Sequence, residues 1–269
     1  MGLLRLPALR QRLMNYVFYL RTATGTPLAL ASRAYELGCK YYGFADHAFM
    51  PFEPEYRMSE AQIDFYENLV KETAEHFRGK MEILLGYEVD FMGDEKYFSP
   101  RVMNSKCDFL IGSVHFLDFW GFDNPAFIGS YEGKDIDELY AQYFEAIARS
   151  ARCGRFDILG HIDLIKVFNY RPKKEIKILA QPAIKAIKEA GVCVELNSAG
   201  WRKPCAELYP SDEILELLAD FDAPITFSSD AHSVEQVGAN MDKTIAKARE
   251  FGYSKACVFK KRSREFISF

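Results

Sequence analysis

Histidine and carboxylate residues follow short apolar runs at five points in this sequence. The runs 41–45, 83–87, 109–114, 156–160 and 224–229 lead in turn to His47, Glu88, His115, His161, Asp230 and His232. Imidazole and carboxylate groups suit zinc, manganese or iron, and a bridging carboxylate holds two cations close enough to share one water. A single histidine or acid after a strand is more often a hydrogen-bonded structural residue. Its repetition after five apolar runs favours a metal cluster.

An anionic substrate at such a cluster also needs positively charged side chains, and Arg202 is the best candidate. It lies in the loop 197–202, which follows the apolar run 192–196, and a guanidinium group matches two oxygens of a phosphate. Lys166 lies in the loop after His161, where a solvated loop cation is an equally good or better interpretation. We expect Arg202 and Lys166 to bind substrate.

Strand-like and helix-like segments alternate along the chain. The runs 41–45, 83–89, 109–114, 156–159, 192–196, 224–228 and 256–259 predict strands, and the segments 27–37, 60–78, 135–152, 174–190, 212–220 and 240–251 predict helices. Thr26 and Pro27 supply a helix cap and a first-turn proline, and Ser59 with Gln62 forms a capping box. Strands separated by helices need crossover connections, which give a parallel sheet.

Seven or eight strand–helix units favour a closed α/β barrel over an open doubly wound sheet. In a parallel barrel the active site lies at the C-terminal ends of the strands, which is where the six candidate ligands fall. No glycine-rich phosphate loop follows a predicted strand, which counts against a nucleotide-binding protein. The predicted strands therefore place all six candidate ligands at the same end of one barrel.

Composition limits the classes of partner. The chain has 269 residues and 49% hydrophobic composition, enough for one sizeable core, and its net charge of −4 offers no basic face for nucleic acid. Six cysteines without CxxC spacing indicate reduced core residues of a cytoplasmic protein. No apolar run reaches the roughly 18 residues of a membrane span. Together with the candidate metal ligands, this composition favours a small-molecule phosphate monoester as the partner, with neither nucleic acid nor membrane.

Six short motifs carry a resemblance to a known family. They are Gly43-Phe44-Ala45-Asp46-His47, Gly86-Tyr87-Glu88, Gly112-Ser113-Val114-His115-Phe116, Gly160-His161-Ile162-Asp163, Glu195-Leu196-Asn197-Ser198 and Ser229-Asp230-Ala231-His232. In this order, across residues 22–260, the chain resembles the PHP-type metal-dependent phosphoesterases and, within them, the histidinol-phosphatases. The last motif is a strong signature of the family, and the ordered set is stronger than any one motif.

The resemblance implies a distorted (β/α)7 barrel with up to three divalent metals that hydrolyses L-histidinol phosphate to L-histidinol and phosphate in histidine biosynthesis. It assigns Glu88 as a bridging ligand, His115 and His161 to the second metal site, Asp230 to the first, and His47 and His232 to the third. It makes Glu88 and Asp230 the expected catalytic residues. Arg202 and Lys166 match positions that tend to hold the substrate phosphate.

The N-terminal segment departs from the family pattern. Such enzymes open with a His-x-His pair and add another histidine before an Ala-x-Gly-Thr stretch, but Met14, Tyr16 and Thr22 occupy those places here. The first acidic residue is Glu36. We therefore expect residues 1–22 to be an atypical segment, explained by a frameshift or by divergence, in front of a single PHP-type barrel domain at 23–269. With these ligands lost, the chain is expected to hold fewer metals than its relatives and to have impaired activity.

Two other functions are also compatible with the sequence. The PHP scaffold serves several substrates, so the chain is alternatively another small-molecule phosphoesterase, acting for example on nucleotides or sugar phosphates. It is otherwise a catalytically inactive metal-binding remnant, which the missing histidines favour and the retained six-ligand set disfavours. The identity of the metal and the oligomeric state do not follow from the sequence.

Overall fold

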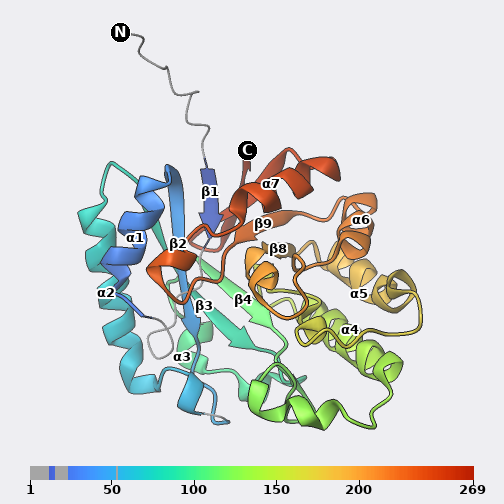
Figure 1. Ribbon diagram of the computed structural model, residues 1–269. Helices are drawn as coiled ribbons and strands as arrows, with labels where there is room; N and C mark the ends of the chain where they lie inside the picture. Colours follow the sequence, from blue (N-terminus) through green and yellow to red (C-terminus); the bar gives the residue numbers. More distant parts are fainter. Residues whose placement is uncertain (1–11, 16–23, 53) are drawn as a thin grey trace.

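Seven parallel strands form a closed barrel in the computed structural model, which describes residues 12–15, 24–52 and 54–269 (Figure 1). In order around the barrel they are β1 (Arg12–Asn15), β2 (Cys39–His47), β3 (Glu82–Asp90), β4 (Phe109–Ser113), β7 (Ile158–Leu159), β8 (Cys193–Asn197) and β9 (Ile225–Ser228). Strand β1 closes the barrel because it pairs with both β2 and β9. This arrangement confirms the predicted (β/α)7 fold class.

Helices follow the barrel strands and form the outer layer around them (Figure 1). They are α1 (Pro27–Glu36), α2 (Ile63–His76), α3 (Pro100–Met103), α4 (Ile136–Arg152), α5 (Ile176–Ala190), α6 (Asp212–Asp220) and α7 (Met241–Glu250). The predicted caps are present, since the Thr26 side chain accepts the Ala29 N–H and the capping box of Ser59 and Gln62 forms both its bonds. The helices therefore lie in the expected crossover connections between parallel strands.

Short 3-10 turns shape the loops at the mouth of the barrel. They are η1 (Pro54–Tyr56), η2 (Glu60–Gln62), η3 (Glu95–Tyr97), η4 (Pro125–Tyr131), η5 (Leu164–Lys166), η6 (Ser198–Arg202) and η7 (Val234–Gln236). The turn η6 begins directly after strand β8, and η5 begins a few residues after β7. The turn η4 follows the hairpin of β5 (Phe116–Leu117) and β6 (Trp120–Gly121). Loops of this kind carry the binding residues of parallel barrels.

The register between neighbouring strands brings the candidate ligands to one end of the barrel. His47 at the end of β2 stands opposite Glu88 of β3, and Asp90 stands opposite Ser113 of β4. All these strands run in the same direction, so their carboxyl ends meet at the same rim. Histidines and acids that are distant in the sequence therefore become neighbours.

Close packing of rings against glycine backbone fills the barrel wall. All five residues of β4 and all five of β8 are buried. A Cβ added at Gly112 would lie 2.2 Å from Cδ2 of Phe156, which is shorter than any ordinary van der Waals contact. Only glycine leaves room for this ring, because protein interiors have few voids to absorb an extra methyl group.

One predicted strand is real but lies outside the barrel. The run 256–259 forms β10 (Lys255–Lys260), which pairs antiparallel with β11 (Ser263–Ser268), a strand with no predicted counterpart in the sequence. Thr226 of β9 donates a hydrogen bond to the carbonyl of Cys257, and the backbone N–H of Lys261 binds the carboxylate of Asp108. The C-terminal hairpin is therefore attached to the barrel, but it is not an eighth barrel unit.

The sequence alone does not decide whether the N-terminal segment forms a barrel strand. The apolar stretch 17–20 lies outside the described residues, and the structure places β1 at Arg12–Asn15, within the segment that the sequence sets apart as 1–22. The division of the chain at residue 22 stays a prediction. Among the described residues, no helix has the length and apolar character needed to cross a membrane.

Candidate metal centre

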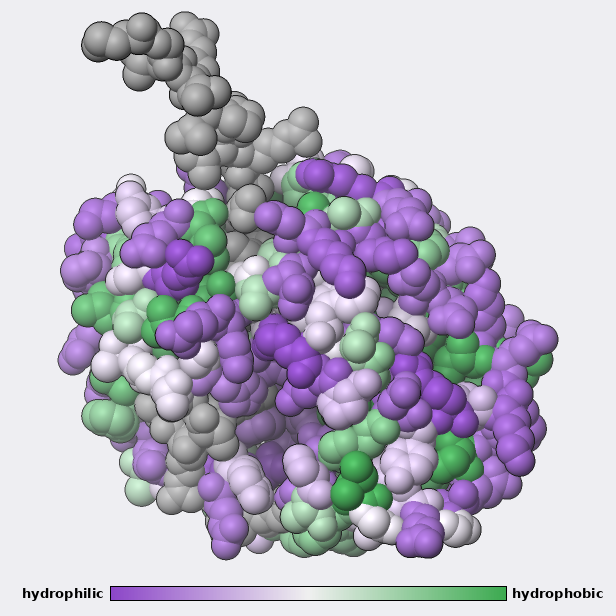
Figure 2. Space-filling view, in the orientation of Figure 1, coloured by the Kyte–Doolittle hydropathy of each residue, from purple (hydrophilic) through white to green (hydrophobic). Residues whose placement is uncertain are grey.

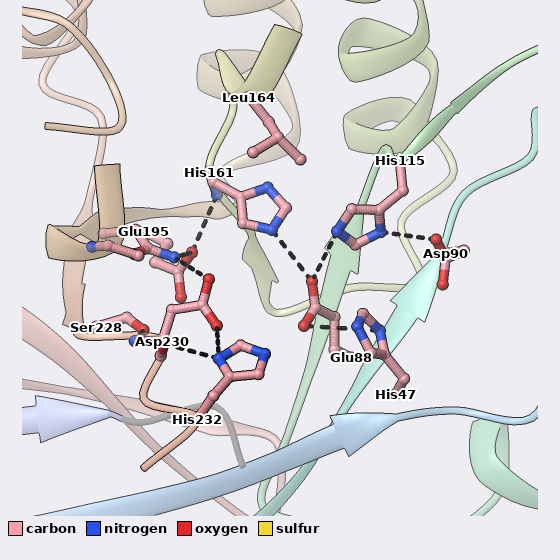
Figure 3. A network of polar contacts seen from close by, with 12 residues as sticks. His47, Glu88, Asp90, His115, His161, Leu164, Glu195, Ser228, Asp230 and His232 are labelled. Atoms are coloured by element: carbon pink, nitrogen blue, oxygen red, sulfur yellow. Dashed lines mark hydrogen bonds and ion pairs between the residues drawn. The ribbon is translucent and has the colours of Figure 1, made fainter. Parts of the chain in front are cut away.

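The carboxylate of Glu88 lies at the centre of the candidate site and is 1% exposed. Its Oε1 atom is 3.2 Å from Nε2 of His161 and 3.5 Å from Nε2 of His115, and its Oε2 atom is 3.9 Å from Nδ1 of His47 (Figure 3). The four side chains come from β2, β3 and the segments that follow β4 and β7. One buried carboxylate thus faces three imidazoles from different parts of the barrel rim.

These separations suit a divalent cation. The candidate ligand atoms of His47, Glu88 and His115 all lie within 4.8 Å of one another. Ligands that bind one zinc ion tetrahedrally at 2.0–2.1 Å stand about 3.4 Å from each other. The observed distances between Glu88 and its three imidazoles surround this value. The donor set is also the mixture of nitrogen and oxygen ligands that zinc, manganese and iron accept.

The charges at the site favour metal binding by Glu88 and His47. Burial lowers the pKa of His47 to about 3, against a smaller opposing effect of Glu88, so its imidazole is neutral at pH 7. Burial tends to raise the pKa of Glu88, but the surrounding imidazoles of His47, His161 and His115 hold it well below its usual range. A neutral imidazole and an ionised carboxylate are the forms that bind metals.

A second carboxylate orients His115. Oδ1 of Asp90 lies 2.7 Å from Nδ1 of this histidine, and Arg57 forms an ion pair with the other oxygen of Asp90. Both Asp90 and Arg57 are at least 95% buried. Burial lowers the pKa of His115, but Asp90 outweighs this effect and raises it to about 10. A carboxylate that holds the Nδ1 proton leaves Nε2 as the nitrogen that binds a metal when it loses its own proton. In this chain, Nε2 is the nitrogen of His115 that faces Glu88.

Asp230 and His232 form a neighbouring group on the segment after β9. Oδ1 of Asp230 is 3.6 Å from Nδ1 of His232, and Nδ2 of Asn197 lies 3.4 Å from Oδ2 of Asp230. The same amide nitrogen donates to Oε2 of Glu195 at 3.0 Å, and that oxygen also accepts the backbone N–H of His161. Glu195 therefore connects the two groups of candidate ligands (Figure 3).

The grouping of the histidines differs from the one that the resemblance implies. The resemblance places His47 with His232, whereas the structure sets His47 beside Glu88 and His115, with 5.3 Å between the His47 and His115 ring centres. His232 lies instead beside Asp230. All six candidate ligands are on the same rim, but which of them share one cation stays a prediction.

Two of the candidate ligands have backbone conformations that are unusual for residues other than glycine. The φ angle is +22° at His161 and +45° at Asp230. Such conformations cost free energy and concentrate at functional sites, where the surrounding structure maintains them. At His161, the backbone N–H is held by Glu195, and the carbonyl accepts a hydrogen bond from Tyr143. These two bonds fix the direction of the imidazole.

The two cations expected to bind substrate have different surroundings. Nη2 of Arg202 donates to the carbonyls of Ser229 and Asp230, at 2.7 and 3.2 Å, which attaches its guanidinium to the segment of two candidate ligands. Nη1 of Arg202 is buried and has no hydrogen-bond partner in the described part of the chain. The guanidinium thus lies next to the centre with one nitrogen still able to donate.

Lys166 is engaged elsewhere. Its ammonium is 2.7 Å from Asp163, 3.1 Å from Glu207 and 2.7 Å from the carbonyl of Leu208, and the residue is 1% exposed. These three contacts take up all three donors of an ammonium group. Lys166 also lines a different cavity from the one beside the histidines. Its surroundings therefore favour a structural role, with the loop around 208 anchored to the one after His161, over the expected phosphate contact.

Sequence reasoning did not single out Asp90, Arg57 and Glu195 as site residues. Asp90 carried a usable signal, because residues two apart on a strand share a face and Asp90 lies two positions after Glu88. Glu195 stood in a quoted motif, inside an apolar run that predicts a buried strand. Arg57 had no comparable signal, since its loop position is typical of a solvated cation.

A pocket of about 270 Å³ opens onto the cluster. It is lined by His47, Tyr56, Arg57, His115, Phe116, Asp123, Asn124, Pro125 and His232. The face of the molecule in Figure 2 is hollowed near its middle, where hydrophilic side chains prevail. The His232 side chain is 36% exposed, whereas that of Glu88 is 1% exposed, so the histidines separate the buried carboxylate from the pocket.

Comparisons with known proteins agree with this geometry. Residues 17–199 match the model of the PHP domain family. The chain is 35% identical over 233 residues to a protein of Deinococcus radiodurans named probable histidinol-phosphatase, which covers 86% of this chain and 89% of that protein. It is 26% identical to the histidinol-phosphatase of Bacillus subtilis, over 77% of this chain and 87% of that one.

Solved structures share the fold. A histidinol phosphate phosphatase of Lactococcus lactis, in complex with zinc, L-histidinol and phosphate, superimposes with a TM-score of 0.79 at 17% identity and covers 95% of this chain and 100% of its own. A putative histidinol phosphatase of Listeria monocytogenes gives a TM-score of 0.75 at 19% identity, over 86% of this chain and 99% of its own.

The barrel, its rim of histidines and acids, and the match over residues 17–199 define a PHP-domain protein, and the chain belongs to the PHP family. Within that family, the curated relatives reported above are histidinol-phosphatases. The resemblance read from the six sequence motifs is therefore confirmed at the level of the family.

Proposed function

We propose that this chain is a metal-dependent phosphoric monoester hydrolase that converts L-histidinol phosphate to L-histidinol and phosphate in histidine biosynthesis. The observation that carries the proposal is the buried carboxylate of Glu88 facing three imidazoles at distances of 3.2–3.9 Å, at the rim of a PHP barrel. The substrate follows from the relatives named histidinol-phosphatase, one of them at 35% identity over 86% of this chain.

In this proposal, the divalent metal is zinc, manganese or iron, and Glu88, His47, His115 and His161 hold it. Asp230 and His232 form the ligands of a further site. A bound cation would supply Lewis-acid activation of the phosphate oxygens and a lowered pKa for water at the site. Zinc is present in the Lactococcus lactis structure. The mixed donor set of this chain does not select one metal over the others.

Arg202 serves in the proposal to bind the phosphate group. Its guanidinium contacts the carbonyls of Ser229 and Asp230, and its buried Nη1 has no protein acceptor among the described residues. A charged donor aimed at a phosphoryl oxygen offsets negative charge that develops during hydrolysis. We assign no such role to Lys166, because its donors are bound by Asp163, Glu207 and Leu208.

The N-terminal departure favours one alternative, an inactive protein that retains a metal site. Met14 lies in β1 and Tyr16 and Thr22 lie outside the described residues, and none of the three side-chain types replaces an imidazole well. Strand β1 pairs with β2 and β9, whose ends lead to His47 and Asp230. A ligand lost from this strand would therefore border both groups of candidate ligands, the Glu88 cluster through His47 and the neighbouring group through Asp230.

The deciding experiment measures metal content and phosphate release on the same purified sample. Metal per chain is determined by plasma mass spectrometry, and phosphate release is compared between histidinol phosphate and nucleoside monophosphates. Bound metal with preferred turnover of histidinol phosphate supports the proposal, and Glu88→Gln should then lose both. Preferred turnover of a nucleotide would replace the substrate, and metal without any turnover would support the inactive alternative.

A restored N-terminus separates impaired activity from lost activity. The combined variant Met14→His, Tyr16→His and Thr22→His should raise turnover by orders of magnitude if only those ligands are lacking. Metal content should rise in the same sample, since new imidazoles complete a site. Unchanged turnover together with unchanged metal content would count against an impaired enzyme.

A further inference from the structure

The pocket beside the metal centre contains an acidic side chain that the proposed hydrolysis does not use. Asp123 is the only carboxylate among the described residues that line this pocket, together with the candidate ligands His47, His115 and His232. A carboxylate has no evident use for the phosphate end of a substrate, because like charges repel. Its presence in the same cavity indicates a second charge of opposite sign on the molecule that enters.

Asp123 forms no hydrogen bond or ion pair with any residue that the structure describes. Its neighbour Asn124 differs, because its side-chain oxygen accepts the Ala126 N–H at 3.0 Å and caps the turn η4. Asp123 is half-buried, so its carboxylate is partly removed from water, and its charge interaction with the imidazole of His115 acts without a hydrogen bond or a contact ion pair. A cationic ligand would stabilise such a carboxylate, because a charge that is removed from water needs a compensating partner.

The backbone around Asp123 is fixed. Phe122 is fully buried, and its carbonyl accepts a hydrogen bond from the Tyr131 hydroxyl at 3.2 Å. Pro125 begins η4 directly after the cap residue Asn124. The carboxylate of Asp123 therefore projects from a segment held on both sides, and a binding group on a rigid segment loses little entropy when a ligand arrives.

We infer that Asp123 binds the protonated amine of an amino-alcohol phosphate and so selects this class among phosphate monoesters. The inference rests on the proposed function, whose substrate carries an amine on the carbon next to the phosphorylated one. Phosphate at the metal centre and amine at Asp123 would place opposite charges of the substrate against opposite charges of the pocket. Phosphate esters without a cationic group lack this second contact.

The test compares Asp123→Asn with wild type on three substrates: histidinol phosphate, phosphoethanolamine and p-nitrophenyl phosphate. The second substrate keeps the amine but not the imidazole, and the third has neither. Loss of a hydrogen bond between charged groups should lower kcat/KM by about tenfold or more, mainly through a higher KM. We expect this loss for both amines and a change of less than about twofold for p-nitrophenyl phosphate.

Two further variants control the experiment. Asp118→Asn removes one negative charge from the exposed tip of the β5–β6 hairpin, at a φ of +47° that asparagine also tolerates, and should leave all three substrates unaffected. Asp123→Glu keeps the charge and should retain part of the preference for amines. Thermal unfolding of each variant shows whether the barrel is intact.

The outcomes separate this inference from the proposed function. Wild-type turnover of histidinol phosphate with equal losses on all substrates, or with none, in Asp123→Asn would overturn the role of Asp123 alone. A loss on histidinol phosphate but not on phosphoethanolamine would also overturn it, because the imidazole would then be the group recognised. A wild-type chain that hydrolyses p-nitrophenyl phosphate but not histidinol phosphate would instead overturn the proposed function.

Discussion

Asp90 is the residue whose replacement tests whether a metal-binding histidine depends on its hydrogen-bonded carboxylate. It contacts Nδ1 of His115 at 2.7 Å and pairs with Arg57, yet it is not one of the candidate ligands. Loss of a carboxylate that orients a metal-binding histidine lowers metal affinity by about ten- to hundredfold. We expect this decrease for Asp90→Asn, measured by competition with a chromophoric chelator.

The matched control for that measurement is Asp220→Asn. Asp220 ends α6 and is exposed, so the variant removes the same charge at a position with no contact to the candidate ligands in the described structure. Its metal affinity should equal that of the wild type. Equal affinities in all three proteins would show that Asp90 does not orient His115 for metal binding.

Glu195 should give the metal-free protein a distinct dependence on pH. Burial raises the pKa of this carboxyl from 4.5 to about 7, with further contributions from neighbouring charges such as Asp230. Between these values the folded state holds a proton that the unfolded chain releases, so the free energy of unfolding falls as pH rises. The shift corresponds to a loss of roughly 3 kcal/mol across this range.

Urea unfolding of the metal-free protein at pH 5 and pH 7 measures this effect. Glu195→Gln keeps an oxygen for the His161 N–H and the Asn197 amide but cannot ionise, so its stability should fall less over the same interval. The same loss in both proteins would place the titration on another residue. Comparing Glu195→Gln with the wild type cancels the effect on stability of the titratable groups that the two proteins share.

At the residue scale, the sequence was informative where a side chain follows a strand. His47, Glu88, His115, His161, Asp230 and His232 all lie on the predicted rim, because strand direction alone decides which end of a strand reaches it. The environment of Lys166 could not be predicted in this way, since its partners Asp163, Glu207 and Leu208 depend on how two loops pack. Loop packing leaves no periodic signal in a sequence.

At the scale of elements, strand β4 depends on glycine for its packing against Phe156. A Cβ at Gly112 would lie 2.2 Å from that ring, so Gly112→Ala must move the ring or the strand. Overpacking of this kind costs about 1–3 kcal/mol. We expect Gly112→Ala to lower the free energy of unfolding by this amount, as measured in urea.

Gly129→Ala is the control for Gly112→Ala. Gly129 lies in η4, and an added Cβ would meet nothing within 4 Å. Its stability should remain within about 0.5 kcal/mol of the wild type. If the two variants were equally stable, the contact between β4 and Phe156 would not limit packing in the barrel wall.

Most elements were predictable because their periodicity and caps agree. The helix expected at 212–220 is α6 with the same bounds, and the helix expected at 27–37 is α1 to within one residue. The hairpin partner β11 was missed because five of its six residues are exposed, and its composition resembles a polar tail. Strand β1 was missed because Arg12–Asn15 lacks a clear apolar run.

For the molecule as a whole, bound metal should stabilise the fold. The candidate ligands come from strands and loops around most of the barrel, so one cation connects elements that are distant in the sequence. At a hundredfold excess over its dissociation constant, a ligand adds about 2.7 kcal/mol, which is about 5–10 °C in the midpoint of thermal unfolding for a domain of this size. Scanning calorimetry with chelator and then with added metal measures this difference.

Glu88→Gln should lose that metal-dependent increase, because the central carboxylate is replaced by an amide. An increase of the same size in this variant would mean that the cation acts away from Glu88. The barrel class was predictable from the number of strand–helix units, but its closing strand β1 was not. The C-terminal hairpin was not, because β10 follows α7 as any barrel strand would and only pairing shows otherwise.

The closure of the barrel has a consequence for the order in which a newly made chain can fold. Strand β1 joins β9 through Asn15 and Ser228, residues 213 positions apart in a chain of 269. During synthesis, β2, β3 and β4 can pair one after another as they emerge, but β1 has only one neighbour until residue 228 leaves the ribosome. The nascent protein therefore exists as an open sheet for most of its synthesis, and the rim that carries His47 and Asp230 is completed almost at the end.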